Sequence, residues 1–255
     1  MNILKKKENR LFLILGGFFI SNAIIAEFIG IKIFSLERTL GIDPYYYSFF
    51  GEKISFNLTA GVLLWPIVFV LTDIINEYFG IKGVRFLSFL TVALISYAFI
   101  GVYFAIHLTP ASWWVKSATS EGIPNFQNAF EKIFGQGLWI IGGSLIAFLI
   151  GQIVDVRVFQ KLKSITGENK IWLRATGSTL ISQLIDSFVV LFIAFKLGAD
   201  WTWSLFLAVG IFNYTFKFIV AIIMTPFIYL AHMAIDRFLG PILSKEMKEE
   251  ALNIN

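Results

Sequence analysis

The chain has 255 residues, of which 57% are hydrophobic and only 15% are charged, and its mean hydropathy is +0.75. A soluble domain is about half apolar and about a quarter charged, so this composition excludes a soluble globular fold and predicts a membrane protein. The net charge of +4 comes from lysines and arginines in short segments between apolar runs, which is typical of membrane topology rather than of nucleic-acid binding.

The first apolar run follows a basic tail with four lysines and arginines in the first ten residues. It extends from Leu11 to about Phe34, which is too long for the hydrophobic region of a signal peptide, and no convincing cleavage site follows it. We therefore expect a retained first span at about residues 11–33. It carries Asn22 and Glu27.

Five further runs have the roughly 20 apolar residues that a spanning helix needs. They lie at about 56–76, 84–107, 137–155, 175–196 and 204–231. The short segment from Gly80 to Arg85 predicts a tight helical hairpin, and the last span is long enough to tilt or bend near Pro226. The predicted fold is all-α, with one domain over residues 1–255 that forms a polytopic membrane bundle of six transmembrane helices.

The connections between the spans differ in charge. Lysines and arginines gather in the N-terminal tail, the 80–85 turn, the loop after the fourth span and the C-terminal tail. The segments 35–54, 108–136 and 197–203 are weakly charged and are flanked by tryptophans. Because basic connections stay in the cytoplasm, both termini are predicted to be cytoplasmic. The polar segment 108–136 is either a cap over the outer end of the bundle or an ordinary surface loop.

Two charged side chains fall near the middle of predicted spans. Asp186 lies in the fifth span, with Gln183 on the same helix face. Lys217 lies in the last span, with Asn213 on the same face. An unpaired lysine at that depth is very unfavourable, so we expect Lys217 to pair with a carboxylate. Asp186 is the nearest in depth, and Asp73 is the second.

A buried structural ion pair and a polar, partly hydrated cavity for a ligand both fit this pattern. The cavity is the favoured interpretation, because four spans add uncharged hydrogen-bonding groups that a lone ion pair would not need. These groups are Asn22, Asn57, Gln183 and Asn213. The candidate substrate-binding residues are Asp186, Gln183, Asn213, Lys217, Asn22 and Glu27.

The remaining charged residues lie nearer the span ends. Asp73 and Glu77 are one turn apart at the inner end of the second span. They are predicted to form an inner gate or a proton-coupling pair, since one of two close carboxylates tends to keep its proton, and a capped helix end is the alternative. Glu27, in the outer third of the first span, is a candidate outward-facing group. Asp155 and Arg157 are predicted at the cytoplasmic end of the fourth span, with a topological or loop-anchoring role.

Enzyme signatures are missing from the sequence. There is no cysteine, and the two histidines, His107 and His232, lie at span ends far apart in the chain. The motifs H-E-x-x-H, G-x-S-x-G and G-x-x-x-x-G-K do not occur. We therefore expect a protein that is not an enzyme and that has neither a metal site nor a cofactor, although these observations only disfavour an intramembrane hydrolase.

Several segments resemble one known family. Residues 72–80 (TDIINEYFG) resemble the T-D-I-x-x-E-x-[YF]-G signature of the bacterial queuosine precursor transporters, with asparagine at a position where threonine or serine is more usual. Residues 172–174 (WLR) and 182–187 (SQLIDS) resemble a second signature, and residues 155–163 fit the pattern of the fourth span. The resemblance covers about residues 60–220, with its motifs in the right order.

This resemblance implies import of 7-deazaguanine bases such as preQ0 and preQ1, the precursors of queuosine in transfer RNA, across the bacterial inner membrane. The partners it implies are a purine-like small molecule and the lipid bilayer, and no nucleic acid. The base would be held by polar groups near mid-membrane. Asp186 or Glu27 would accept its ring N–H and exocyclic amine, and amides would donate to its carbonyl. Phe212, Tyr214 or Trp65 would stack on the ring.

Three questions stay open at this point. Six-helix membrane subunits bind vitamins for ATP-driven importers, and no feature of the sequence excludes such a substrate-binding subunit. Proton-coupled transport and facilitated diffusion are both compatible with the sequence. A monomer and a homo-oligomer are equally compatible with it.

Overall fold

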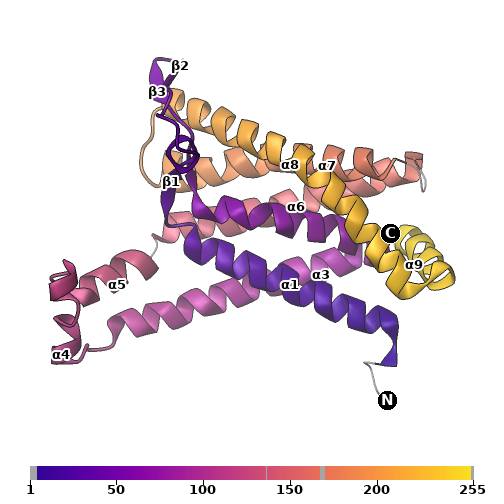
Figure 1. Ribbon diagram of the computed structural model, residues 1–255, viewed down its shortest axis with the longest axis horizontal. Coiled ribbons are helices and arrows are strands. Elements are labelled where there is room, and N and C mark those ends of the chain that lie inside the picture. The colour runs from indigo at the N-terminus through magenta and orange to yellow at the C-terminus, as the bar shows by residue number, and fades with distance from the viewer. Residues whose placement is uncertain (1–4, 136, 167–169, 254–255) are drawn as a thin grey trace.

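The computed structural model of the protein describes residues 5–135, 137–166 and 170–253, and long helices lying side by side dominate it (Figure 1). Within these residues, five helices are long and apolar enough to cross a membrane. They are α1 (Lys7–Ile29), α3 (Trp65–His107), α6 (Leu138–Thr166), α7 (Ile171–Leu191), which continues as the π-helical segment η4 (Phe192–Leu197), and α8 (Trp203–Leu239). The prediction of an all-α, multi-pass membrane protein is confirmed.

The helix α3 consists of two arms joined at Gly80. This residue has φ 66° and ψ −171°, a conformation that is nearly restricted to glycine, and the chain reverses direction there (Figure 1). The arms correspond to the predicted second and third spans. The predicted start near residue 56 is wrong, because the helix begins only at Trp65, with Pro66 in its first turn. Residues 57–59 form a strand instead.

Four short strands lie at one end of the bundle, where the sequence predicted a loop at 35–54 and the start of the second span. The strand β1 (Ile33–Ser35) pairs antiparallel with β4 (Asn57–Thr59), and β2 (Tyr47–Phe49) pairs antiparallel with β3 (Glu52–Ile54). The short helices α2 (Leu36–Thr39) and η2 (Ala60–Leu63) complete this segment. We call residues 33–63 the strand cap.

Hydrogen bonds and aromatic rings hold the strand cap in place. The backbone N–H of Phe56, at 2.8 Å, and the hydroxyl of Ser35, at 3.0 Å, donate to the carboxylate of Glu37. Burial alone would raise the pKa of Glu37, but these hydrogen bonds lower it below its usual value. The ring of Phe56, together with those of Tyr47 and Phe49, surrounds Phe212 of α8 at centroid distances of 4.9–5.7 Å. The strand cap therefore packs on one end of α8.

The segment that follows α3 is helical. It contains α4 (Ser112–Val115), η3 (Thr119–Glu121) and α5 (Phe126–Phe134), and it lies at the same end of the molecule as the strand cap (Figure 1). The side chain of Gln127 donates to the carbonyl of Ile106 at 3.0 Å, and the ring of Phe134 lies 6.3 Å from that of Phe28 on α1. The segment thus packs against the ends of α1 and α3.

The C-terminal helix α9 (Pro241–Asn253) lies at the opposite end of the bundle, where α1 begins (Figure 1). Its Ala251 passes very close to the turn in α3: a Cβ atom built at Gly80 would lie 2.8 Å from the carbonyl oxygen of Ala251. The apolar core that joins these elements includes Phe19, Ile75, Phe148 and Leu239. The two ends of the bundle are thus built differently, with short strands at one and α9 at the other.

Candidate functional site

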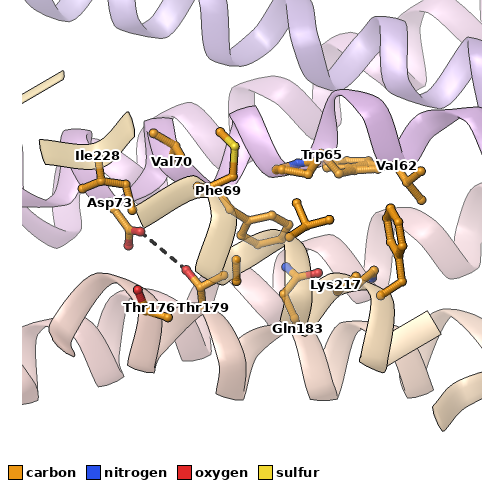
Figure 2. A pocket seen from close by; sticks show the side chains of 15 residues that line it. Val62, Trp65, Phe69, Val70, Asp73, Thr176, Thr179, Gln183, Lys217 and Ile228 are labelled. Carbon is orange, nitrogen blue, oxygen red and sulfur yellow. Dashed lines mark hydrogen bonds between the residues drawn. The ribbon is translucent and has the colours of Figure 1, made fainter. Parts of the chain in front are cut away.

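A pocket opens between the first arm of α3, α7 and α8 (Figure 2). Its polar lining groups are Asp73, Thr176, Thr179, Gln183 and Lys217. Its aromatic lining groups are Trp65, Phe69 and Phe216. The space open to the centre of a water molecule is about 50 Å³, which suits a few waters.

One face of α7 supplies most of the polar groups of this pocket. Thr176, Thr179 and Gln183 are three and four residues apart, so their side chains project from the same side of the helix. Gln183 is buried, and its Nε2 has no hydrogen-bond partner among the residues that the structure describes. The hydroxyl of Thr179 lies 3.5 Å from Oδ2 of Asp73, at the outer limit of a hydrogen bond (Figure 2). The pocket therefore offers an unused donor and a weakly satisfied carboxylate.

Lys217 of α8 is paired with Asp186 of α7. Its Nζ donates to Oδ2 of Asp186 at 2.5 Å, so the predicted pairing is confirmed. The two side chains are 22% and 17% exposed, so the protein does not fully enclose the pair. Lys217 lines the pocket, whereas Asp186 packs against α6. A Cβ atom built at Gly151 of α6 would lie 3.5 Å from the Cβ atom of Asp186. Asp186 thus holds the lysine in place rather than facing the pocket.

Three other predicted site residues do not line the pocket. The amide of Asn22 donates to the carbonyl of Phe18 in its own helix at 2.8 Å. Asn213 lies half-buried on α8, outside the lining. Glu27 is buried in α1, and both its oxygens accept from the hydroxyl of Ser144 at 2.9 Å. Of the predicted substrate-binding residues, the pocket brings together Gln183 and Lys217, with Asp186 behind them.

The position of Asp155 corrects the sequence analysis. The helix α6 continues to Thr166 instead of ending near residue 155, so Asp155 lies within the helix and is 0% exposed. It accepts a hydrogen bond from the hydroxyl of Ser182 at 2.9 Å. The prediction that the fourth helix ends near residue 155 is wrong, because the polar residues after Asp155 belong to a helix packed on its neighbours rather than to a loop. Arg157, by contrast, is exposed.

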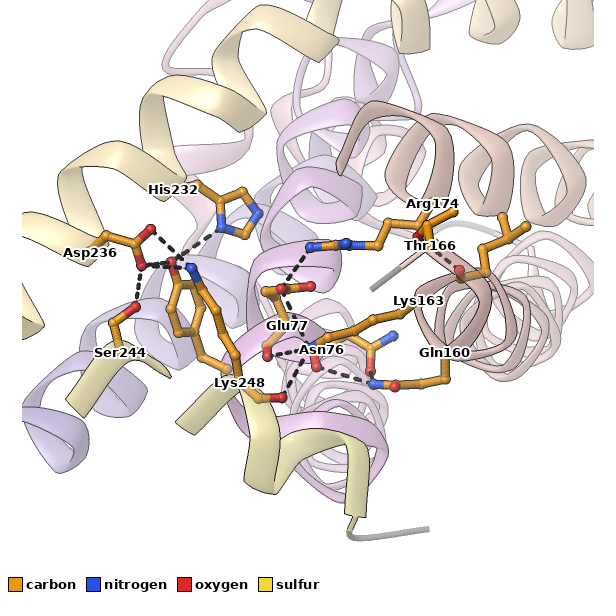
Figure 3. A network of polar contacts seen from close by, with 12 residues as sticks. Asn76, Glu77, Gln160, Lys163, Thr166, Arg174, His232, Asp236, Ser244 and Lys248 are labelled. Carbon is orange, nitrogen blue, oxygen red and sulfur yellow. Dashed lines mark hydrogen bonds and ion pairs between the residues drawn. The ribbon is translucent and has the colours of Figure 1, made fainter. Parts of the chain in front are cut away.

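Glu77 belongs to a network of polar contacts away from the pocket (Figure 3). Its Oε1 lies 2.8 Å from Nη2 of Arg174 and 3.4 Å from Nζ of Lys163. The same ammonium group donates to the carbonyls of Glu77 and Lys248 at 3.0 and 3.2 Å. Asp73 and Glu77, which were predicted as one gate or pair, therefore have different surroundings.

The network extends to α8 and α9. Tyr78 donates to Oδ1 of Asp236 at 2.7 Å, and Nζ of Lys248 lies 2.9 Å from the same carboxylate (Figure 3). Ser244 also donates to Asp236. Sequence reasoning treated Arg174 and Lys163 only as loop charges, although both fall within the segments that resemble the family. The positions of Arg174 and Lys163 in these family-like segments were the signal in the sequence that their side chains are buried.

Comparisons with known proteins agree with the motifs. Residues 59–231 match the model of the family described as "Putative vitamin uptake transporter". The chain is 33% identical to the "Probable queuosine precursor transporter" of Bacillus subtilis (strain 168) over 184 residues, which are 71% of this chain and 74% of that protein. It is 30% identical to the protein of the same name from Haemophilus influenzae over 180 residues, 68% of each chain.

A third relative extends the comparison. The chain is 26% identical to the "Queuosine precursor transporter" of Escherichia coli (strain K12) over 174 residues, which are 67% of this chain and 70% of that protein. No solved structure matches the chain. All three relatives are named as transporters rather than as enzymes. The chain therefore belongs to the vitamin uptake transporter family, together with these queuosine precursor transporters.

Proposed function

We propose that this protein imports 7-deazaguanine bases, such as preQ0 and preQ1, across the bacterial inner membrane. The observation that carries the proposal is the pocket between α3, α7 and α8, which combines a carboxylate, an unused amide donor and three aromatic rings within a chain of this family. We further propose that residues 1–255 form one domain with six spans, the two arms of α3 counting separately, and that both termini are cytoplasmic. Basic connections and the turn at Gly80 support this topology.

The chemistry of the pocket suits a flat, polar heterocycle. The carboxylate of Asp73 would accept two N–H groups from the edge of the base, the role first considered for Asp186 or Glu27. The Nε2 of Gln183 lacks a partner among the described residues and would donate to the ring carbonyl. Trp65 and Phe69 would stack on the ring. Lys217, held by Asp186, would keep a cation beside the carbonyl edge.

We interpret the small size of the pocket as a closed form of the carrier. About 50 Å³ holds a few water molecules, whereas a bicyclic base needs more room. Binding would therefore require α8 to move away from α3 and α7, which is the kind of rearrangement that alternating access demands. Because α8 carries Lys217 and Phe216, this movement would open the pocket on one side.

The proposal is tested by uptake of labelled preQ1 in cells that cannot synthesise the base. Cells with the wild-type protein should accumulate the label, and Asp73→Asn or Gln183→Leu should lower uptake by about tenfold or more, since each removes a buried polar contact to the base. The control is Asn22→Ala, which removes an amide that donates to a carbonyl of its own helix and lies outside the pocket lining. It should leave uptake within about twofold of wild type.

Two results would contradict the proposal at different levels. No uptake above empty cells, with the protein present in the membrane, would overturn the function. Normal uptake by both pocket variants would keep the function and reject this pocket. Uptake by the purified protein in liposomes would further separate a self-sufficient carrier from a binding subunit that requires an ATP-driven partner.

A further inference from the structure

Behind the pocket, two buried carboxylates share one set of hydroxyl groups. Asp73 on α3 and Asp155 on α6 are 1% and 0% exposed, and their charges interact. Ser182 donates to Oδ1 of Asp155 at 2.9 Å, and the hydroxyl of Ser178 lies close to both carboxylates. Oδ1 of Asp73 and Oδ2 of Asp155 have no hydrogen-bond partner within the part of the chain that the structure describes. Among the described residues, each carboxylate thus keeps one unsatisfied oxygen in the protein interior.

The cations near this pair contact other carboxylates. Buried and half-buried charged or titratable groups on the surrounding helices include Glu27 of α1, Glu77 of α3, Lys163 of α6, Arg174 and Asp186 of α7, and Lys217 and His232 of α8. Lys163 and Arg174 form ion pairs with Glu77, and Lys217 forms an ion pair with Asp186. Over residues 5–135, 137–166 and 170–253, no lysine or arginine comes within ion-pairing distance of the two aspartates. The negative charge of Glu77 acts on Asp73 as well.

Two buried, ionised carboxylates whose charges interact, with no cation beside them, are strongly unfavourable in a membrane interior. One proton shared between them removes one charge and turns an unsatisfied oxygen into a donor. The two positions are not equivalent, because Asp73 lines the pocket and Asp155 does not. A proton held on Asp155 leaves Asp73 ionised and able to accept the N–H groups of a base.

We propose that Asp73 and Asp155 form a proton-binding pair that must hold one proton when the carrier closes around a base, so that each base enters with one proton. This inference rests on the proposed import of 7-deazaguanine bases. Asp73 contacts the base, Asp155 holds the proton, and the hydroxyls of Ser178 and Ser182 stabilise the pair. No bond of the base is broken, and one base and one proton pass from the outside to the cytoplasm.

The test uses the purified full chain in liposomes that contain a pH-sensitive dye. The probe is preQ0, whose side group is an uncharged nitrile, so that its own entry brings no proton. With the wild-type protein, external preQ0 should acidify the lumen, and an acidic exterior should increase its accumulation. Asp155→Asn should lower base-driven acidification by about tenfold or more while exchange of labelled for unlabelled preQ0 at equal pH stays within about twofold of wild type.

The matched control is Asp200→Asn, the same carboxylate-to-amide change in the exposed loop between η4 and α8. Asp200 has φ 51°, which asparagine adopts readily, so this variant should acidify the lumen as the wild type does. Base exchange without acidification, and with no response to the pH gradient, in the wild-type protein would overturn the proton pair and leave the proposed import intact. Absence of preQ0 exchange in the wild-type protein would instead reject the import on which the inference depends.

A second variant keeps the test decisive if Asp155→Asn also loses exchange. Ser182→Ala removes the hydroxyl that donates to Asp155 and leaves both carboxylates in place. Because a carboxylate that loses a donor keeps its proton more readily, the midpoint of the pH dependence of uptake should move to higher pH. An unchanged midpoint in this variant would overturn the assignment of the proton to Asp155.

Discussion

Within the predicted spans, the carboxylates differ in the number and kind of their partners. Glu77 contacts two cations, Asp186 contacts one, and Asp155 has a serine hydroxyl. Ionisable groups in a membrane interior are costly, and the cost is met by pairing, by hydrogen bonds or by a bound proton. These three solutions separate residues that look alike in the sequence. The Lys217–Asp186 pair is the one that lies beside the pocket.

A double-mutant cycle tests the Lys217–Asp186 pair. Lys217→Met or Asp186→Asn leaves one charge without its partner, and each should lower the thermal stability of the detergent-solubilised protein. Breaking a fully buried pair costs about 3–5 kcal/mol, and partial exposure should reduce the measured interaction energy to about 1–3 kcal/mol. The double variant should therefore be more stable than the sum of the single losses predicts.

The exposed pair Lys245–Glu249 on α9 is the control for this cycle. Its side chains are 73% and 60% exposed and its charged atoms are 3.8 Å apart, so its interaction energy should be close to zero. Strictly additive losses of stability in the Lys217 and Asp186 variants would show that the Lys217–Asp186 pair stabilises the protein no more than the exposed Lys245–Glu249 pair.

Sequence reasoning found the Lys217–Asp186 pair because both residues fall at one depth in apolar segments. It ended the fourth helix too early, near Asp155, because a polar stretch after an apolar run looks like a helix end whether it is solvated or packed on a neighbouring helix. It expected Asn22 to face the pocket, although Asn22 is satisfied within its own helix. Depth along a span can be read from the sequence, whereas the direction of a side chain depends on which helix faces meet.

Among the elements, the turn at Gly80 has the strictest local requirement. Its positive φ disfavours any side chain, and a Cβ there would meet the backbone of Ala251 at 2.8 Å. The residue thus connects two features: the reversal of α3 and the docking of α9. Its position within the segment 72–80 that resembles the family is consistent with both.

We expect Gly80→Ala to destabilise the protein by about 1–3 kcal/mol or more, through backbone strain and displacement of α9. Thermal unfolding in detergent measures this effect. Gly101→Ala in the second arm of α3 is the matched control, because nothing lies within 4 Å of a Cβ at that position. It should be neutral or stabilising by up to about 1 kcal/mol, since alanine favours a helix. Equal behaviour of the two variants would contradict the role assigned to Gly80.

The long helices were predictable because apolar composition over about 20 residues is a strong signal. The strand cap was not, because three-residue strands such as β1 and β4 depend on pairing between segments far apart in the chain. The late start of α3 has a local signal in Pro66, which marks the first turn of a helix. The long α6 reflects packing of its second half against α3, α7 and α9, which hydropathy does not detect.

For the whole molecule, the proposed topology can be tested directly because the chain has no cysteine. Single cysteines at Lys82 and Lys245 should be labelled by a membrane-impermeant maleimide only from the cytoplasmic side, and those at Tyr45 and Lys132 only from the outside. These side chains are exposed, so access depends on the membrane rather than on packing. Spheroplasts and inverted vesicles measure the two sides, and the cysteine-free parent reports background.

The labelling of position 82 tests where the turn of α3 lies. Protection of a cysteine at Lys82 from both sides would place the turn at Gly80 inside the membrane, and labelling from the outside would reverse the proposed orientation. Agreement of Lys82 with Lys245 would support six spans with the C-terminal helix in the cytoplasm.

The Asp73–Asp155 pair also bears on the energy that drives uptake. A neutral base that enters with the proposed single proton carries one positive charge inward, so the membrane voltage acts on each cycle. One charge moved through 100 mV is worth about 2.3 kcal/mol, which corresponds to roughly fiftyfold accumulation at equilibrium. An inside-negative bacterium would then concentrate the base even where the external and internal pH are equal. Two aspartates that pair with no cation among the described residues would be the structural origin of that voltage dependence.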